Sequence, residues 1–147
     1  MHILLVEDNP ADARLLREAM DDGAQFAGDQ PLFDLHWVAS GEQALQFLRR
    51  ATAYATAPTP DLVLLDLNLP GLHGHEVLAA IKGDAALAAI PVVVLSSSAA
   101  RHDVSQAYAA HANAYMLKPV DYEQCLALVA AIRCYWFGAA LLPASGR

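Results

Sequence analysis

The segment Leu62-Val63-Leu64-Leu65-Asp66 points to the fold class, because an unbroken apolar run ends abruptly in an acid. Such a run is typical of a strand in a parallel sheet, where both faces of the strand are buried. A second run, Val92–Leu95, is introduced by Pro91 and ends in serines. Helix-length segments separate these runs from their neighbours, which is the spacing that parallel strands require for their crossover connections.

The same alternation of strands and helices extends in both directions along the chain. Apolar strands are expected at 3–6, 33–37 and 115–117, besides the two runs above. Residues 33–37 alternate between apolar and polar side chains, so this strand is expected near a sheet edge. Helix starts are indicated by Asn9-Pro10, Ser40 and Asp121, all of which are residues that cap helices well. Five strands alternating with five helices predict a doubly wound α/β fold with a parallel sheet.

The composition describes one acidic domain with a substantial core. The chain has 147 residues, of which 56% are hydrophobic and 17% charged, and its formal net charge is −7. The apolar content argues against a disordered chain, and the negative charge argues against nucleic-acid binding. We expect a single domain over residues 1–147. Only four residues follow Pro143, too few for an output domain.

The segment Gln124–Leu142 is almost uniformly apolar and carries a single charge, Arg133. A membrane span needs about 20 apolar residues, and a central arginine is costly in a bilayer. We therefore expect a helix that is buried against the domain or a partner, with an extension over about 134–147. No secretory signal is recognisable, and Cys125 and Cys134 fit no disulfide pattern, so a cytoplasmic location is expected.

Polar groups stand where four of the five expected strands stop: Glu7-Asp8, Asp66, Ser96 and Lys118. In open parallel sheets, ligands bind just outside the carboxyl ends of the strands, so these side chains are expected to converge. Each has an ordinary explanation when taken alone, as a solvated loop, a helix cap or a surface lysine. Their shared position at strand ends favours a functional site.

Three carboxylates in one crevice require a cation, because their mutual repulsion would otherwise raise a pKa. Lys118 supplies one positive charge, and a set of oxygen ligands favours Mg²⁺ as the remaining one. His73 and His75 flank the site but are expected to be loop residues rather than ligands. The arrangement suits phosphoryl transfer, with Asp66 as the nucleophile and with Lys118 and Ser96 contacting the phosphoryl oxygens.

The pattern resembles the receiver domains of two-component response regulators over the whole chain. The matching pieces are Val6-Glu7-Asp8-Asn9, Leu64 to Gly71, Gly74, Ser96 and Lys118-Pro119. The resemblance implies a flavodoxin-like sheet with strand order 2-1-3-4-5. It also implies a phosphorylation switch that catalyses only its own phosphorylation and dephosphorylation, rather than an enzyme acting on other substrates.

The resemblance implies a role for each residue of the acidic pocket. Asp66 would be the phosphoacceptor, and Mg²⁺ would be held by Asp8, Asp66 and the main-chain carbonyl of Asn68, with Glu7 acting indirectly. Lys118 would contact the phosphoryl group.

Two further implications concern the neighbouring strands. Lys118 would be joined to Pro119 by a cis peptide bond. Ser96 and Tyr115 would form the switch pair, in which the hydroxyl moves towards the phosphoryl group and the aromatic ring turns inward.

Three additions resemble the single-domain regulators associated with bacterial phytochrome histidine kinases: the long loop Asp21–Pro31, a long segment before Asp61, and the extended last helix with Tyr135-Trp136-Phe137. This likeness implies a phytochrome-type sensor kinase as partner. It also implies a homodimer through the fourth helix, fifth strand, fifth helix and C-terminal extension. The three aromatic residues are either an interface or a part of the domain's own core.

Other functions remain as alternatives. A phosphatase of the haloacid dehalogenase type would carry a second aspartate where Asn68 stands, and an amide cannot transfer a proton as that acid does. A pseudo-receiver scaffold would have lost an acid, the acceptor or the lysine, and none is lost here. A carrier role in a multistep phosphorelay stays open beside an end-point role. Asn68 and Ser98 are expected to line the path of the hydrolysing water.

Overall fold

The computed structural model describes residues 1–26, 28 and 33–144, and these residues form one parallel sheet with helices around it. The strands are β1 (His2–Val6), β2 (Asp34–Val38), β3 (Leu62–Asp66), β4 (Val92–Ser96) and β5 (Ala114–Leu117). The α-helices are α1 (Pro10–Gly23), α2 (Gly41–Leu48), α3 (Gly74–Gly83), α4 (Arg101–Ala109) and α5 (Tyr122–Cys134). The sheet order is β2-β1-β3-β4-β5, which confirms the predicted fold and strand order.

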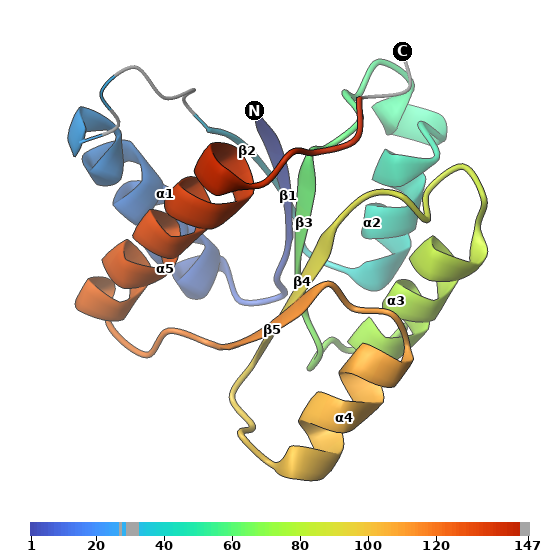
Figure 1. Cartoon of the computed structure of the whole chain (residues 1–147). Coiled ribbons are helices and arrows are strands. Elements are labelled where there is room, and N and C mark those ends of the chain that lie inside the picture. The colour runs from blue at the N-terminus through green and yellow to red at the C-terminus, as the bar shows by residue number, and fades with distance from the viewer. Residues whose placement is uncertain (27, 29–32, 145–147) are drawn as a thin grey trace.

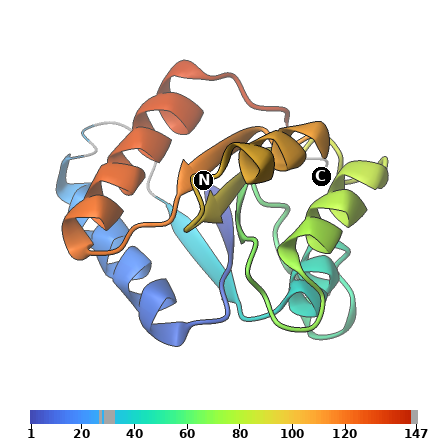
Figure 2. The same ribbon diagram turned by 90° about the horizontal axis from the view of Figure 1, so that it is seen from below.

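Helices cover both faces of the sheet (Figure 1). α1 and α5 pack together on one face, while α2, α3 and α4 cover the other, and the view from below shows the same separation (Figure 2). Along β1, Ile3 and Leu5 join the core on the α1 and α5 side, and Leu4 and Val6 join the core on the α2 and α3 side. Burial of both faces explains why the central strands are apolar at every position.

The edge strands are less buried than the three strands between them. β2 lies at a sheet edge, as predicted, but its burial does not follow the alternation of the sequence: Asp34 and Trp37 are exposed, Leu35 and His36 are partly buried, and Val38 is buried. At the other edge, all four residues of β5 are exposed or partly buried. The loop expected at 21–31 starts later than predicted, because α1 continues to Gly23 and a 3₁₀ turn spans Ala24–Phe26; residues 27 and 29–31 of that loop lie outside the described residues.

Side-chain caps set the start of three helices. Asn9, Ser40 and Asp121 each accept a hydrogen bond from a first-turn amide, with shortest distances of 2.9, 3.2 and 2.8 Å. Three residues after each of these two serine and aspartate caps, a glutamine side chain accepts a hydrogen bond from the amide one residue before the cap. Gln43 accepts from Ala39, and Gln124 accepts from Val120. This arrangement is similar to a capping box. The capping residues read from the sequence are therefore confirmed.

The helix at the C-terminus is shorter than the sequence suggested. α5 ends at Cys134, a π-helical turn spans Tyr135–Ala139, and the backbone at Ala140 is extended. The wider π turn adds a residue to the last helical turn and lets Phe137 reach the core. The single charge of this segment, Arg133, is buried with its guanidinium 4.2 Å from the ring centre of Phe33.

No helix in the described part of the chain is long and apolar enough to cross a membrane.

Candidate functional site

The carboxyl ends of four strands bring the predicted site residues together. Asp66 ends β3 and Ser96 ends β4, while Glu7 and Lys118 come directly after β1 and β5. The side chains of Asp66, Glu7 and Ser96 are deeply buried although all three are polar. Buried polar groups of this kind require partners. Lys118 contacts Glu7 and Asp66, and the backbone amides of Asn9, Asn68 and Ser98 donate to Glu7, Asp66 and Ser96 respectively.

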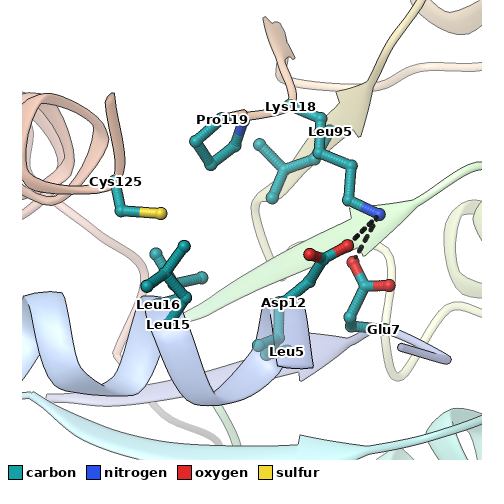
Figure 3. Close-up of a pocket in the computed structure, with 9 residues that line it drawn as sticks. All are labelled: Leu5, Glu7, Asp12, Leu15, Leu16, Leu95, Lys118, Pro119 and Cys125. Carbon is teal, nitrogen blue, oxygen red and sulfur yellow. Dashed lines mark ion pairs between the residues drawn. The ribbon is translucent and has the colours of Figure 1, made fainter. Parts of the chain in front are cut away.

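Lys118 lies among three carboxylates, and Figure 3 shows two of them, Glu7 and Asp12. Its Nζ atom is 2.8 Å from Oε2 of Glu7, 3.1 Å from Oδ2 of Asp66 and 3.3 Å from Oδ2 of Asp12. Burial by itself would lower the pKa of Lys118, but the hydrogen bonds to Glu7 and Asp66 outweigh it, and the pKa is raised. The side chain is therefore a permanent cation.

Asp12 is a member of the site that the sequence did not reveal. It belongs to the first turn of α1 and not to a strand end, so the rule about strand ends could not find it. The available signal was its position three residues after Asn9, on the helix that the Asn9-Pro10 pair starts beside the acidic pocket. Behind it, Leu16 and Cys125 line the same small pocket as Lys118.

Glu7 carries the clearest electrostatic perturbation of the site. Burial raises its pKa to about 7, and repulsion by Asp66 acts in the same direction. Hydrogen bonds from Lys118 and from the amide of Asn9 oppose this rise. With all four acids ionised, Glu7, Asp8, Asp12 and Asp66 face one ammonium group. The site therefore favours a further cation.

A divalent cation fits this group of acids. Glu7, Asp8 and Asp66 each offer a carboxylate oxygen, and these oxygens lie within 4.8 Å of one another. An all-oxygen set suits a hard ion such as Mg²⁺, Mn²⁺ or Ca²⁺. The amide of Asn68 donates to Oδ1 of Asp66 at 2.9 Å, which places the backbone of residue 68 beside the same carboxylate. His73 precedes α3 without a side-chain cap bond.

Gly74 fixes the start of α3 against the end of β3. A Cβ atom at this position would lie 2.5 Å from the carbonyl oxygen of Asp66 and 2.5 Å from Cα of Leu67. The amide of Gly74 donates to the carbonyl of Leu67 at 3.2 Å, which closes the loop that follows Asp66. Only a residue without a side chain allows this approach, so Gly74 lets α3 start directly against the backbone at the end of β3, which carries Asp66.

The two predicted switch residues contact the same loop between β4 and α4. The Ser96 hydroxyl accepts a hydrogen bond from the amide of Ser98 at 3.1 Å, and the Tyr115 hydroxyl donates to the carbonyl of Ser98 at 2.8 Å. The Ser98 hydroxyl in turn donates to the carboxylate of Asp103 in α4. The ring of Tyr115 is half-buried, and it is tied to the loop through its hydroxyl.

The expected cis bond between Lys118 and Pro119 was wrong, because the described residues contain no cis peptide bond. Trans is the lower-energy form of the bond before a proline. With this geometry the Lys118 amide donates to the carbonyl of Ser96 at 2.8 Å, while its ammonium still reaches Glu7 and Asp66.

The three aromatic residues after α5 have different surroundings. Phe137 is buried, with its ring centre 5.1 Å from that of Phe33. Trp136 is partly buried against the same core, and its ring meets that of Tyr135 edge-on at 5.1 Å. Tyr135 is 57% exposed. Phe137 is therefore a core residue, and Tyr135 is the ring that is most available to a partner.

Comparisons with known proteins agree with this geometry. Residues 3–130 match the family profile of the response regulator receiver domain. The chain is 42% identical over 136 residues to the probable methanogenesis regulatory protein FilR2 of Methanothrix harundinacea, covering 92% of this chain and 83% of that protein. The chain therefore belongs to the response regulator receiver domain family.

The relatives also confirm the likeness to response regulators that are associated with phytochromes. Response regulator Rcp1 of Synechocystis is 40% identical over 143 residues, covering 97% of this chain and 93% of that protein. Its Mn²⁺-bound crystal structure matches with a TM-score of 0.84 over 97% and 99% of the two chains, at 38% identity. The phosphorylated cyanobacterial phytochrome response regulator RcpA matches with a TM-score of 0.86 at 43% identity, over 97% and 98%. The chain thus resembles phytochrome response regulators throughout its length.

Proposed function

We propose that Asp66 accepts a phosphoryl group from a sensor histidine kinase and that this modification changes the protein's contacts with other proteins. The observation that carries the proposal is the position of the Asp66 carboxylate. It lies buried at the end of β3, 3.1 Å from the Lys118 ammonium, within a group of acids that suits a divalent cation. The likeness to phytochrome response regulators supports a phytochrome-type kinase as the phosphodonor.

The residues around Asp66 have separate tasks in this reaction. Asn68 orients the carboxylate by donating to Oδ1, which leaves Oδ2 beside the Lys118 ammonium. As Asp66 Oδ attacks phosphorus, the bond from phosphorus to the histidine nitrogen of the kinase breaks and the imidazole leaves. Lys118 stays protonated and neutralises charge on the phosphoryl oxygens, and the Ser96 hydroxyl donates to one of them. We assign Mg²⁺ to Asp8, Asp66 and the Asn68 carbonyl, with Glu7 acting indirectly. When bound, it supplies further neutralisation of that charge.

The contacts of Ser98 suggest how phosphorylation of Asp66 changes the structure at the protein surface. When the Ser96 hydroxyl turns to a phosphoryl oxygen, its bond to the Ser98 amide is lost. The loop that also holds the Tyr115 hydroxyl then moves, and the ring of Tyr115 turns inward. A modification that adds about one negative charge relative to the free carboxylate is enough to bias such a two-state loop.

Phosphotransfer with purified components tests the assignment of Asp66. We expect one phosphoryl group per chain from a cognate histidine kinase or from acetyl phosphate, dependent on Mg²⁺ and absent from the Asp66→Asn variant. The matched control is Asp21→Asn, an exposed aspartate of α1, which should be labelled like wild type. Labelling of the Asp66→Asn protein at the wild-type rate would refute the proposal.

The same preparations separate the remaining possibilities. Sustained turnover of p-nitrophenyl phosphate would indicate a phosphatase instead of a protein that catalyses only its own phosphorylation and dephosphorylation. Complete failure of Mg²⁺-dependent phosphorylation would indicate a scaffold. Rapid transfer from phosphorylated Asp66 to a histidine phosphotransfer protein would identify a relay carrier.

We also propose a homodimer through α4, β5, α5 and the C-terminal extension. β5 lies at the sheet edge between α4 and α5 (Figure 1). Tyr108 of α4, Leu117 of β5, Val120 after β5 and Tyr135 after α5 are all large apolar residues that are exposed. Exposed apolar side chains on these elements favour a protein interface. Light scattering should give a dimer for wild type, a monomer for Leu117→Lys, and a dimer for the control Gln46→Lys on α2. A monomeric wild type at high concentration, with and without phosphorylation, would exclude this dimer.

We propose a cytoplasmic protein that works through protein contacts rather than nucleic acid. The net charge of −7 opposes approach to a phosphate backbone. Mobility-shift measurements at low salt should show no complex with duplex DNA, and a stable complex there would contradict this.

A further inference from the structure

Two histidines meet at the sheet edge, at the opposite end of β1 from the acidic pocket. Nδ1 of His2 and Nε2 of His36 are 3.1 Å apart. In the register of β1 and β2, His2 lies beside Asp34 and Leu4 lies beside His36, so the three polar side chains share one face of the sheet. The strand separates His2 from Glu7 by about 16 Å, since each residue of a strand advances about 3.3 Å.

We infer that His2 and His36 form a second metal site, with Asp34 as a third ligand, for a divalent transition-metal ion that binds imidazole. The separation of the two nitrogens carries this inference. Nitrogens bound to one ion at about 2.0–2.1 Å, with an angle between about 90° and 109°, are about 2.9–3.4 Å apart. The observed 3.1 Å falls inside this interval, so both nitrogens can bind one ion that lies to the side of the line joining them, once the hydrogen now between the rings has left.

Asp34 is placed to complete the ligand set. Its Oδ2 atom is 3.8 Å from Nδ1 of His2, and its side chain is 67% exposed, so it can rotate towards a bound ion without disturbing the core. Water can fill the remaining positions, because the side chain of His2 is also partly exposed. Imidazole and carboxylate ligands together suit Zn²⁺, Ni²⁺ or Cu²⁺, whereas Mg²⁺ prefers oxygen ligands alone. The two sites therefore select different ions.

Neighbouring groups affect the protonation state and the position of the two imidazole rings. Burial lowers the pKa of His36, as does the nearby His2, which keeps one ring neutral and able to bind a metal. Asp34 acts in the opposite direction, and Arg17 adds to the lowering. The ring of Phe47 lies 5.4 Å from that of His36, and the backbone amide of His2 donates to Asp61 at 2.8 Å. Both histidines are therefore positioned before any ion arrives.

Zinc titration of the full chain tests the site. With metal removed first and Mg²⁺ present in excess to occupy the acidic pocket, calorimetry should show one Zn²⁺ per chain. His2→Gln and His36→Gln should each weaken binding at least about tenfold, consistent with the loss of one ligand. His102→Gln, an exposed histidine of α4, should bind like wild type. Equal Zn²⁺ affinity in wild type and His36→Gln would overturn the inference.

A spectroscopic measurement on the wild-type protein keeps the test independent of how the variants fold. Among the six histidines of the chain, Zn²⁺ should shift the imidazole ¹⁵N resonances of His2 and His36 first. Shifts elsewhere with these two unchanged would show a hydrogen-bonded pair only, and would overturn the inference. The Asp66→Asn variant should keep the site, so this result does not depend on the phosphorylation proposal.

Discussion

The Nζ atom of Lys118 lies 2.8 Å from Oε2 of Glu7, closer than to either of the other two carboxylates that it contacts. This pair does not abolish the cost of burying Glu7, because its pKa is still raised to about 7. Without a divalent cation, the pocket therefore holds an acid that titrates near neutral pH. Its protonation state is coupled both to folding and to metal binding.

The first prediction is that the metal-free protein loses stability as the pH rises from about 5 to 7. The pKa of Glu7 is about 7 when folded, against an ordinary value of 4.5, so the folded state binds the extra proton between these values. The free energy of unfolding is therefore highest at the acid end of this window and falls towards pH 7, by on the order of 2 kcal/mol.

Urea denaturation in the presence of a chelator, at several pH values, measures this slope. The lowered pKa of His36 acts in the opposite direction, so the comparison must be with Glu7→Gln, which keeps His36. The difference between the two proteins should grow with pH between 5 and 7. Curves that stay parallel would show that Glu7 is ionised throughout.

The second prediction concerns Asp12, the carboxylate of α1 that lies 3.3 Å from the Lys118 ammonium. Its side chain is 44% exposed, so Asp12→Asn should change stability by less than about 1 kcal/mol. Removal of its charge should accelerate phosphorylation by acetyl phosphate about threefold, because Asp12 and Asp66 contact the same ammonium group, and a unit charge about 6 Å away in water contributes roughly 0.7 kcal/mol of repulsion. Glu18→Gln, further along α1, serves as the control, and a slower Asp12→Asn protein would contradict this reasoning.

The third prediction separates two glycines of α3. Gly74→Ala forces a methyl group within 2.5 Å of the Asp66 carbonyl, so it should destabilise the protein by more than about 2 kcal/mol and slow phosphorylation. Gly83→Ala meets no atom within 4 Å and should be neutral or slightly stabilising, by up to about 1 kcal/mol. Thermal denaturation and phosphorylation rates measure both. Equal effects of the two substitutions would show that the contact at Gly74 relaxes easily.

The fourth prediction concerns the hydrogen bond between the Tyr115 hydroxyl and the Ser98 carbonyl. Tyr115→Phe removes the hydroxyl that donates to the Ser98 carbonyl at 2.8 Å, at a cost of about 1 kcal/mol. The backbone resonance of Ser98 should shift in NMR spectra of the unphosphorylated protein, because the loop is released. Tyr108→Phe, on a ring that is 49% exposed, should leave that resonance in place. An unchanged Ser98 resonance in Tyr115→Phe would show that the hydroxyl does not hold the loop.

The fifth prediction compares two neighbouring aromatic residues. Phe137→Ala removes a buried ring that contacts Phe33 and should destabilise the monomer by about 3 kcal/mol. Tyr135→Ala should cost less than about 0.5 kcal/mol, since that ring is largely exposed. Chemical denaturation at a concentration too low for dimers measures both. A large loss from Tyr135→Ala would place that ring in the core as well.

Much of the fold followed from the sequence because its strongest signals are local. The buried run that ends in Asp66 and the caps at Asn9, Ser40 and Asp121 reflect physics within a few residues. The meeting of Glu7, Asp66 and Lys118 was also predictable, because the carboxyl ends of parallel strands lie at one edge.

Features that depend on packing between distant segments were not predictable in the same way. Asp12 joins the site through the direction in which α1 leaves the sheet, so its position three residues after Asn9 could mark it as a candidate but could not place it beside Lys118. The π turn at Tyr135–Ala139 contains Phe137, which packs against Phe33, more than a hundred positions away in the sequence. The contact between His2 and His36 required the register of β1 and β2, which only the three-dimensional structure supplies.

The path of the chain after the π turn has a practical consequence for experiments. Pro143 and Ala144 lie beside Pro60 and Pro91, which precede β3 and β4 at their amino ends. Asp66 and the acidic pocket lie at the opposite end of β3. A fluorophore or a surface linker attached beyond Ala144 would therefore start on the side away from that pocket, which makes this attachment point suitable for immobilised binding assays and single-molecule measurements.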